Sequence, residues 1–80
     1  MNDDVFIGRQ IHIVRTEKGI KQVELANLIN KNQATYSNKE AGRRPFSIKE
    51  LKIICNYLQI NMEDLLNAKP VSNYDKNLNK

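Results

Sequence analysis

Residues 33–38 of the chain, QATYSN, combine amide and hydroxyl side chains, which donate and accept hydrogen bonds, with one large apolar residue, Tyr36. A helix that only fills a core carries more apolar side chains than this. An amide can pair with adenine, a hydroxyl can reach several base edges, and an alanine or threonine methyl can contact the methyl group of thymine. The segment therefore predicts a recognition surface, although any surface helix of a small protein is also polar.

Cationic side chains surround this polar segment. Between residues 31 and 44 the charged residues are Lys31, Lys39, Arg43 and Arg44 against Glu40 alone, a net charge of +3. The whole chain of 80 residues carries +4 and has a pI of about 9.4. A basic window beside a polar segment suggests a polyanion as the partner. A solvated surface has the same composition, so charge alone favours both interpretations equally.

Residues that could do covalent or metal chemistry are few. His12 is the only histidine and lies among apolar neighbours, so we expect a surface or boundary residue rather than a ligand or a base. The only cysteine, Cys55, cannot form an intramolecular disulfide, and its place on an apolar stripe predicts a buried side chain. Glu63 and Asp64 suit the start of a short helix. The sequence contains no catalytic triad, phosphate-binding glycine loop or metal motif, so we predict no enzyme activity, no cofactor and no metal.

Apolar spacing and helix-end signals predict a compact all-α fold of five short helices. They are expected at residues 4–18, 22–30, 33–41, 48–58 and 62–67. The inward stripes of the first and fourth helices are Ile7, Ile11 and Val14, and Ile48, Leu51, Ile54, Cys55 and Leu58. The helix ends are marked by Gly19, Asn30 and Gly42, and the helix starts by the caps Asn32, Ser47 and Asn61, with a capping box from Ser47 to Glu50.

The chain is expected to form one domain, because 80 residues are near the lower end of what an apolar core alone can stabilise. We assign residues 1–67 to this domain and residues 68–80, polar and Asn-rich after Pro70, to a disordered tail. The sequence shows no signal peptide and no run of about 20 apolar residues. We therefore expect a cytoplasmic protein without membrane contact.

The order of these pieces resembles the phage-repressor (Cro-like, XRE) helix-turn-helix family of small DNA-binding transcription regulators. The stretch IGRQIHIVRTEKGIKQVELA is similar to the family's first helix, its glycine turn and the opening of the second helix. NKNQATYSNKEAGRRPFS is similar to the turn, the recognition helix and the following loop, and IKELKIICNYLQINMEDLL to the last two helices. The resemblance covers residues 7–66. It implies a five-helix lambda-repressor-like domain whose third helix enters the major groove of double-stranded DNA.

The resemblance also implies a role for each matching side chain. The positions that face base edges are Gln33, Ala34, Thr35, Ser37 and Asn38. Phosphate contacts are expected from Gln22, Lys31, Lys39, Arg43 and Arg44, and Gln22 is also expected to buttress Gln33. Arg15 and Glu40 match positions that form a structural ion pair between the first helix and the end of the third.

Three lysines depart from the family pattern. Lys21 stands where a Ser or Thr cap is usual, so the second helix is expected to lack about 1 kcal/mol of stabilisation. Lys31 and Lys39 stand where apolar residues are common. Both can bury their stems and direct their ammonium groups towards phosphate.

Apolar residues outside the inward stripes predict a surface for self-association. Ile53 and Tyr57 lie four residues apart on the fourth helix, and with Met62 they are the candidates for a homodimer interface. Scattered apolar surface residues are ordinary, which is the alternative. A dimer would present two recognition helices about one DNA turn apart, roughly 34 Å, and would select a near-palindromic site.

These observations predict a bacterial or phage-encoded, nucleoid-associated, sequence-specific transcription regulator that acts as a repressor. Such families include phage repressors, controllers of restriction–modification genes and antitoxins that repress their own operons, and the sequence favours none of these three. The alternative from another class is a protein-interaction module of the same fold, such as an antitoxin that neutralises a partner protein. Tyr74 and Leu78 of the tail are the anchors expected in that case.

Overall fold

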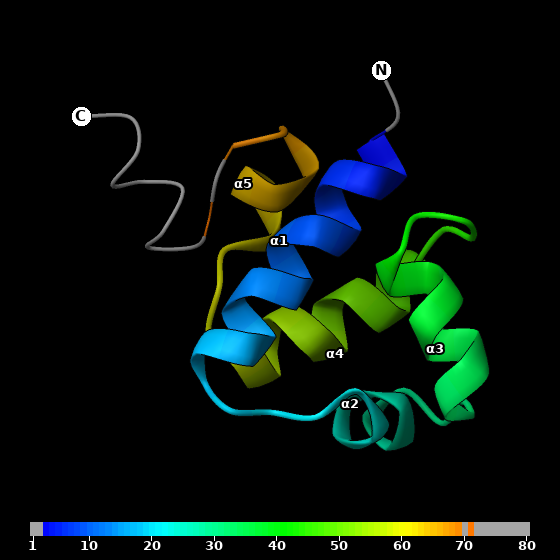
Figure 1. Ribbon diagram of the computed structural model, residues 1–80. Coiled ribbons are helices and arrows are strands. Elements are labelled where there is room, and N and C mark those ends of the chain that lie inside the picture. The colour runs from blue at the N-terminus through cyan, green and yellow to red at the C-terminus, as the bar shows by residue number, and fades with distance from the viewer. Residues whose placement is uncertain (1–2, 70, 72–80) are drawn as a thin grey trace.

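The computed structural model describes residues 3–69 and Val71, and these residues confirm the predicted all-α fold (Figure 1). The helices are α1 (Asp3–Glu17), α2 (Gln22–Leu28), α3 (Gln33–Glu40), α4 (Ile48–Leu58) and α5 (Met62–Leu66), and the described residues contain no strand. Helix α1 contacts both α3 and α5, whereas α2 contacts α3 and α4. No helix among the described residues combines the length and the apolar character that crossing a membrane requires.

The helices begin where their first residues can satisfy free backbone amides. The side-chain oxygen of Asn32 caps α3 and that of Asn61 caps α5, each by accepting from the amide three residues further along the chain, at 2.7 and 3.0 Å. Helix α4 starts with the predicted capping box between Ser47 and Glu50. Lys21 precedes α2 without a side-chain cap bond, as its residue type predicts.

The helices end at residues that adopt left-handed backbone conformations. Gly19 (φ 70°), Asn30 (φ 60°) and Gly42 (φ 83°) follow α1, α2 and α3. Helix α2 ends at Leu28, earlier than predicted, because residues 29–32 form the turn into α3. A Cβ on Gly42 would overlap Val5 of α1, so this position needs glycine for space as well as for conformation.

The core is formed by apolar side chains from all five helices. Its buried members are Ile7, Ile11, Val14, Leu25, Ala26, Ile29, Tyr36, Leu51, Ile54, Cys55, Leu58, Leu65 and Val71. Ile48 is a correction to the predicted stripe of α4, because this residue is 53% exposed. It is the first residue of α4, and the buried stripe begins one turn later at Leu51.

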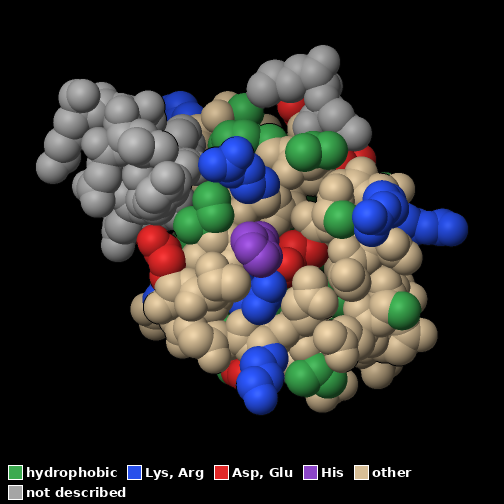
Figure 2. Space-filling view, in the orientation of Figure 1, with side chains coloured by type: hydrophobic (Ala, Val, Ile, Leu, Met, Phe, Trp, Pro, Cys, Tyr) green, Lys and Arg blue, Asp and Glu red, His purple; other side chains and the backbone are tan. Residues whose placement is uncertain are grey.

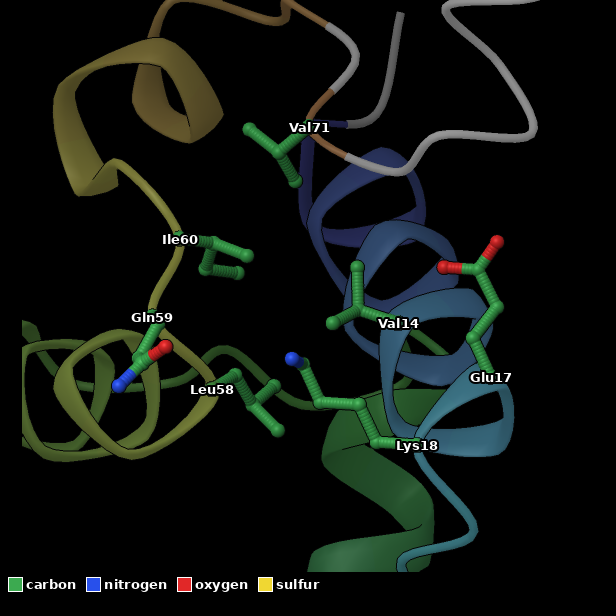
Figure 3. A pocket seen from close by; sticks show the side chains of 7 residues that line it. All are labelled: Val14, Glu17, Lys18, Leu58, Gln59, Ile60 and Val71. Atoms are coloured by element: carbon green, nitrogen blue, oxygen red, sulfur yellow. The ribbon is translucent and has the colours of Figure 1, made fainter.

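Val71 packs with the helical domain, although the sequence places it in the tail. Its side chain is buried and its amide donates to Oε1 of the buried Gln10 at 3.1 Å. Figure 3 shows it at a cleft of about 470 Å³ between α1 and the connection from α4 to α5. Residues 70 and 72–80 of the predicted tail, which include Tyr74 and Leu78, lie outside the described residues.

Candidate DNA-binding surface

Helices α2 and α3 are joined by a tight turn that fixes how α3 leaves the core. The amide of Lys31 in this turn donates to the carbonyl of Ala26 at 2.9 Å. Tyr36 of α3 is fully buried, and its ring packs against Phe46 of the next loop at a centroid distance of 5.9 Å. Tyr36 therefore anchors one face of α3 and leaves the opposite face to solvent.

The outward part of α3 carries the base-reading candidates. Gln33 and Ala34 are exposed, whereas Thr35, Ser37 and Asn38 are half-buried. In Figure 1, α3 lies at the right-hand edge of the molecule, beside α2 and below the loop that leads to α4. A helix placed at such an edge can approach a groove that is wide enough for an α-helix, as the DNA major groove is.

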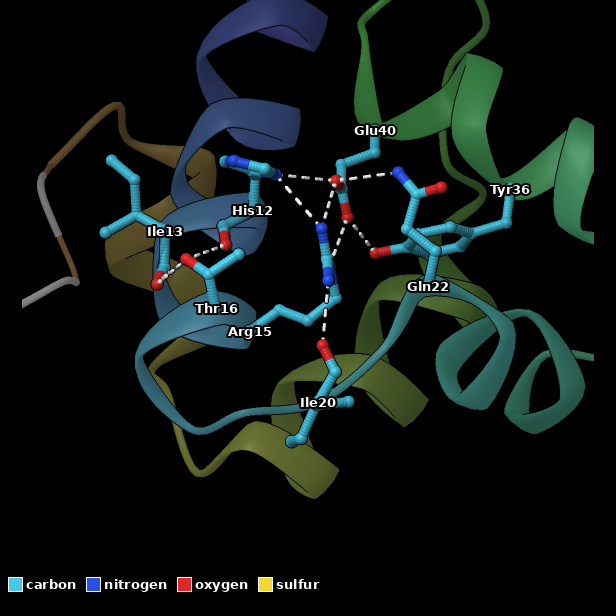
Figure 4. Close-up of polar contacts among 8 residues, drawn as sticks. All are labelled: His12, Ile13, Arg15, Thr16, Ile20, Gln22, Tyr36 and Glu40. Carbon is cyan, nitrogen blue, oxygen red and sulfur yellow. Dashed lines mark hydrogen bonds and ion pairs between the residues drawn. The ribbon is translucent and has the colours of Figure 1, made fainter.

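The last residue of α3, Glu40, is the centre of a hydrogen-bond network that ties α3 to α1 (Figure 4). Arg15 donates to both of its carboxylate oxygens, from Nε at 2.9 Å and from Nη2 at 3.0 Å. The hydroxyl of Tyr36 donates at 2.6 Å and the amide of Gln22 at 3.1 Å. Nδ1 of His12 lies 2.9 Å from Oε1. The structure thus brings Arg15 and Glu40 together as an ion pair and surrounds the pair with three further side chains.

This network keeps Glu40 ionised. Burial alone raises the pKa of a carboxyl, but the hydrogen bonds from Arg15, Tyr36, His12 and Gln22 outweigh burial and lower the pKa of Glu40 to about 2. The hydrogen bond to Glu40 raises the pKa of the Arg15 guanidinium. Burial and the same carboxylate raise the pKa of the Tyr36 hydroxyl. At neutral pH the junction therefore contains a charged pair and a neutral phenol that donates to it.

A close backbone contact accompanies the network. Gly8 of α1 lies against the backbone of Glu40, and a Cβ added at Gly8 would overlap the Glu40 carbonyl oxygen. Glycine at this helical position therefore permits the close approach of α1 and α3.

Sequence reasoning missed Gly8, His12 and Tyr36 as members of this junction. Tyr36 lies four residues before Glu40, which places both on one face of a helix and is a usable signal. Gly8 and His12 carry no local signal, because Glu40 is 32 and 28 residues away from them. His12 reaches the surface as expected, and it is the purple side chain in Figure 2.

Cationic residues flank α3 on the side of the turn and of the loop to α4. Lys31, Arg43 and Arg44 are exposed. Lys31 and Arg44 line a cleft of about 310 Å³ together with Thr35, Asn38 and Lys39. The amide oxygen of Asn38 accepts a hydrogen bond from Nη1 of Arg43 at 3.2 Å. The structure therefore brings base-reading and phosphate candidates onto one surface.

Lys39 and Gln22 also have protein partners that the sequence did not indicate. The ammonium of Lys39 donates to Glu50 at 2.9 Å and to the carbonyl of Pro45 at 3.1 Å. The Glu50 carboxylate, which caps α4, lies within reach of the lysine stem. Gln22 donates to Glu40, and the described contacts of its side chain do not include Gln33.

The dimer candidates occupy different environments. Ile53 and Met62 are half-buried and pack against the core. Tyr57 is 44% exposed, and its hydroxyl donates to Glu24 of α2.

Cys55 is buried as predicted, and burial raises the pKa of its thiol to about 11. Among the residues with described positions, no three His, Cys, Asp or Glu side chains form a group able to bind a metal ion.

The family model described as helix-turn-helix matches residues 11–65 of the chain. This match covers more than half of the sequence, and the chain therefore belongs to the XRE-type helix-turn-helix family. Its members are DNA-binding transcription regulators rather than enzymes. A comparison with curated proteins found no matching sequence.

Solved structures from two bacteria share this fold. The clp gene regulator ClgR from Corynebacterium glutamicum is 26% identical, with a TM-score of 0.71, over 82% of this chain and 86% of that one. A second structure of ClgR has a TM-score of 0.73 and the same identity, over 82% of this chain and 70% of that one. The restriction-modification controller protein C.AhdI from Aeromonas hydrophila is 28% identical, with a TM-score of 0.70, over 81% of this chain and 98% of that one.

Proposed function

We propose that this protein is a repressor that binds double-stranded DNA sequence-specifically with α3 in the major groove. The observation that carries the proposal is the position of α3. Gln33 and Ala34 are exposed, while Tyr36 and Glu40 of the same helix are buried, and Glu40 accepts two hydrogen bonds from Arg15 of α1. A helix fixed in this way has little conformational freedom left to lose on binding, so its side chains meet base edges in one orientation.

The side chains at the start of α3 are proposed to read bases. The exposed amide of Gln33 can donate and accept at once, which suits the N6 and N7 atoms of adenine. The exposed methyl group of Ala34 can contact the methyl group of thymine. Ser37 and Asn38 follow on the next turn, where half-burial restricts their rotamers. Each good contact of this kind discriminates against a wrong base by about 1–3 kcal/mol.

The cations beside α3 are proposed to bind the phosphate backbone. Lys31, Arg43 and Arg44 are exposed and lie on both sides of the helix in sequence. Such contacts set the orientation of the protein on the duplex and make its affinity depend on salt, but they do not read sequence.

The binding unit is proposed to be a homodimer on a near-palindromic operator. The contact is proposed to involve Ile53, Tyr57 and Met62, of which Tyr57 is 44% exposed and Ile53 and Met62 are partly buried. ClgR is a clp gene regulator and C.AhdI is a restriction-modification controller protein, and the similarity to them supports a regulatory role. Repression follows where the operator overlaps a promoter. We also propose a cytoplasmic location, where such a DNA partner is found.

Selection of bound duplexes from a random pool, followed by mobility-shift titration at two salt concentrations, tests the proposal. We expect a near-palindromic sequence with half-sites roughly 34 Å, one helical turn, apart. Expression from a promoter that carries the selected site should fall when the protein is produced. Recovery of no preferred sequence, or a reporter that rises, would contradict the proposal.

The variant Gln33→Ala tests the base-reading role directly. We expect it to lose about 1–3 kcal/mol on the selected duplex and to discriminate less among bases at one position. Asn56→Ala, which removes an exposed amide from α4, is the matched control and should leave both properties unchanged. Equal behaviour of the two variants would exclude Gln33 from the interface.

A further inference from the structure

One cleft on the proposed DNA-binding surface is lined by polar and cationic side chains. It has a volume of about 310 Å³ and is lined by Lys31, Thr35, Asn38, Lys39 and Arg44. The cleft therefore lies between the turn that precedes α3, the outer side of α3 and the loop that follows it. Its lining offers three cationic groups, one hydroxyl and one amide.

Among the residues that line the cleft, Lys39 already forms an ion pair within the protein. Its Nζ lies 2.9 Å from Oε1 of Glu50, and the two side chains are only 13% and 10% exposed. The same carboxylate oxygen accepts from the amide of Ser47 at 2.9 Å, which closes the capping box of α4. Glu50 therefore serves two partners, the start of α4 and the ammonium group at the cleft.

The charges at the cleft favour an anion with several oxygen atoms. Burial tends to raise the pKa of Glu50, but the Ser47 amide and the Lys39 ammonium outweigh it, with Lys31 adding to the same effect, and the pKa is lowered. Glu50 is thus ionised and neutralises one of the three cations. Lys31 and Arg44 are exposed at the opening. A phosphate group can accept from two basic side chains and from a hydroxyl at the same time.

We propose that this cleft binds one phosphate of the DNA backbone and that Glu50 competes with that phosphate for Lys39. In free protein Lys39 is paired with Glu50, and on DNA its ammonium turns to the phosphate oxygens. Glu50 thereby weakens binding to all sequences without affecting base readout, which sets how strongly the protein holds non-operator DNA. The inference rests on the proposed DNA-binding function.

The variant Glu50→Gln separates the two roles of Glu50. A glutamine oxygen still accepts from the Ser47 amide, because Gln also serves at this position of a capping box. The negative charge, and with it the competition for Lys39, is lost. We expect affinity for a random duplex to rise by about three- to tenfold at low salt, and the slope of log K against log salt to steepen by about 0.9, the value for one added phosphate contact.

Glu63→Gln is the matched control, because it removes one exposed carboxylate from α5, on the far side of α1 from α3 in Figure 1. A uniform charge effect would raise affinity equally in both variants and would overturn the inference. The effect must also disappear in the background Lys39→Met, where no ammonium is left to release. Persistence of the steeper slope in that background would equally overturn it.

Lys31→Met provides a test that does not depend on the capping box. We expect it to weaken binding to random duplex and to flatten the salt slope by about 0.9, while Lys69→Met, at the far end of the chain from α3, changes neither. If Glu50→Gln fails to fold, as judged by circular dichroism, this pair still decides whether the cleft binds a phosphate. Equal slopes for the two lysine variants would exclude the cleft as a phosphate site.

Titration with inorganic phosphate distinguishes a DNA phosphate from a free anion. The proposal expects Glu50→Gln to change duplex binding, with no saturable binding of inorganic phosphate at millimolar concentration. Tighter phosphate binding in Glu50→Gln with unchanged duplex binding would overturn the DNA assignment. If the wild-type protein binds no duplex at all, the proposed function fails. If the wild-type protein binds duplex, and Glu50→Gln and Glu63→Gln have the same affinity for random duplex and the same salt slope, only this inference fails.

Discussion

Replacing Glu40 by glutamine removes the one negative charge on which four side chains converge. Arg15 would then stay protonated at 7% exposure with no carboxylate beside it. Breaking a buried pair by removing one partner costs about 3–5 kcal/mol, because the other charge remains buried without compensation. The lowered pKa leads to a similar value: a fall from 4.5 to about 2 corresponds to about 3 kcal/mol of stabilisation at neutral pH.

The pH dependence of this effect has a definite sign. The pKa of Glu40 is lower in the folded than in the unfolded protein, so its stabilisation is fully present above the unfolded value of 4.5. It is lost as pH falls from there through about 2, where the folded protein takes up the proton as well. Wild-type protein and Glu40→Gln should therefore differ most at neutral pH and converge in acid.

Urea unfolding followed by circular dichroism at several pH values between 7 and 2.5 measures this difference. For a domain of this size, a loss of about 3 kcal/mol is a large part of a total stability of ~5 kcal/mol, so the variant should unfold at much lower urea concentration. Glu17→Gln, at an exposed carboxylate in α1, is the control and should match the wild type. The role given to Glu40 would be refuted if Glu40→Gln lowered the free energy of unfolding by less than about 1 kcal/mol at pH 7. It would also be refuted if the difference between the variant and the wild type persisted in acid.

Two further changes test the placement of α3 and its charges. Gly8→Ala should destabilise the domain by about 1–3 kcal/mol through overpacking against the Glu40 carbonyl, despite the better helix propensity of alanine, and thermal unfolding measures the loss. An equally stable variant would show that α1 and α3 need no close contact. Arg43→Ala should weaken binding to every duplex alike and flatten the salt slope by about one, whereas Lys69→Ala should not. A slope unchanged by Arg43→Ala would remove this residue from the phosphate contacts.

The sequence predicts the helices well because their ends are decided locally. Asn32, Ser47 and Asn61 accept from amides three residues away, and Gly42 adopts a conformation that few other residues tolerate. These signals depend only on residues that lie within a few positions of one another in the sequence. Ile48 is the exception within a helix, because its place on the apolar stripe predicts burial, whereas as the first residue of α4 it is 53% exposed.

The side-chain partners could not be predicted to the same extent, because they join distant parts of the chain. The sequence indicates Glu50 as a cap of α4, but its bond to Lys39 depends on how the loop at Pro45 folds back. Gln22 can reach a phosphate or Glu40, and only the packing of α2 against α3 decides between them. Val71 is buried, and its backbone amide donates a hydrogen bond to the side chain of Gln10, which is 61 residues earlier in the sequence.

Chemical-shift mapping of the isotope-labelled protein with the selected duplex tests the central claim most directly. We expect the largest amide shifts on DNA binding in residues 33–38, with smaller ones at Lys31, Arg43 and Arg44. Glu40 and the core of α1 should shift little, because α3 should bind as a preformed helix. Shifts concentrated on α4 and α5, with residues 33–38 unchanged, would contradict the claim that the outer face of α3 is the surface that meets DNA.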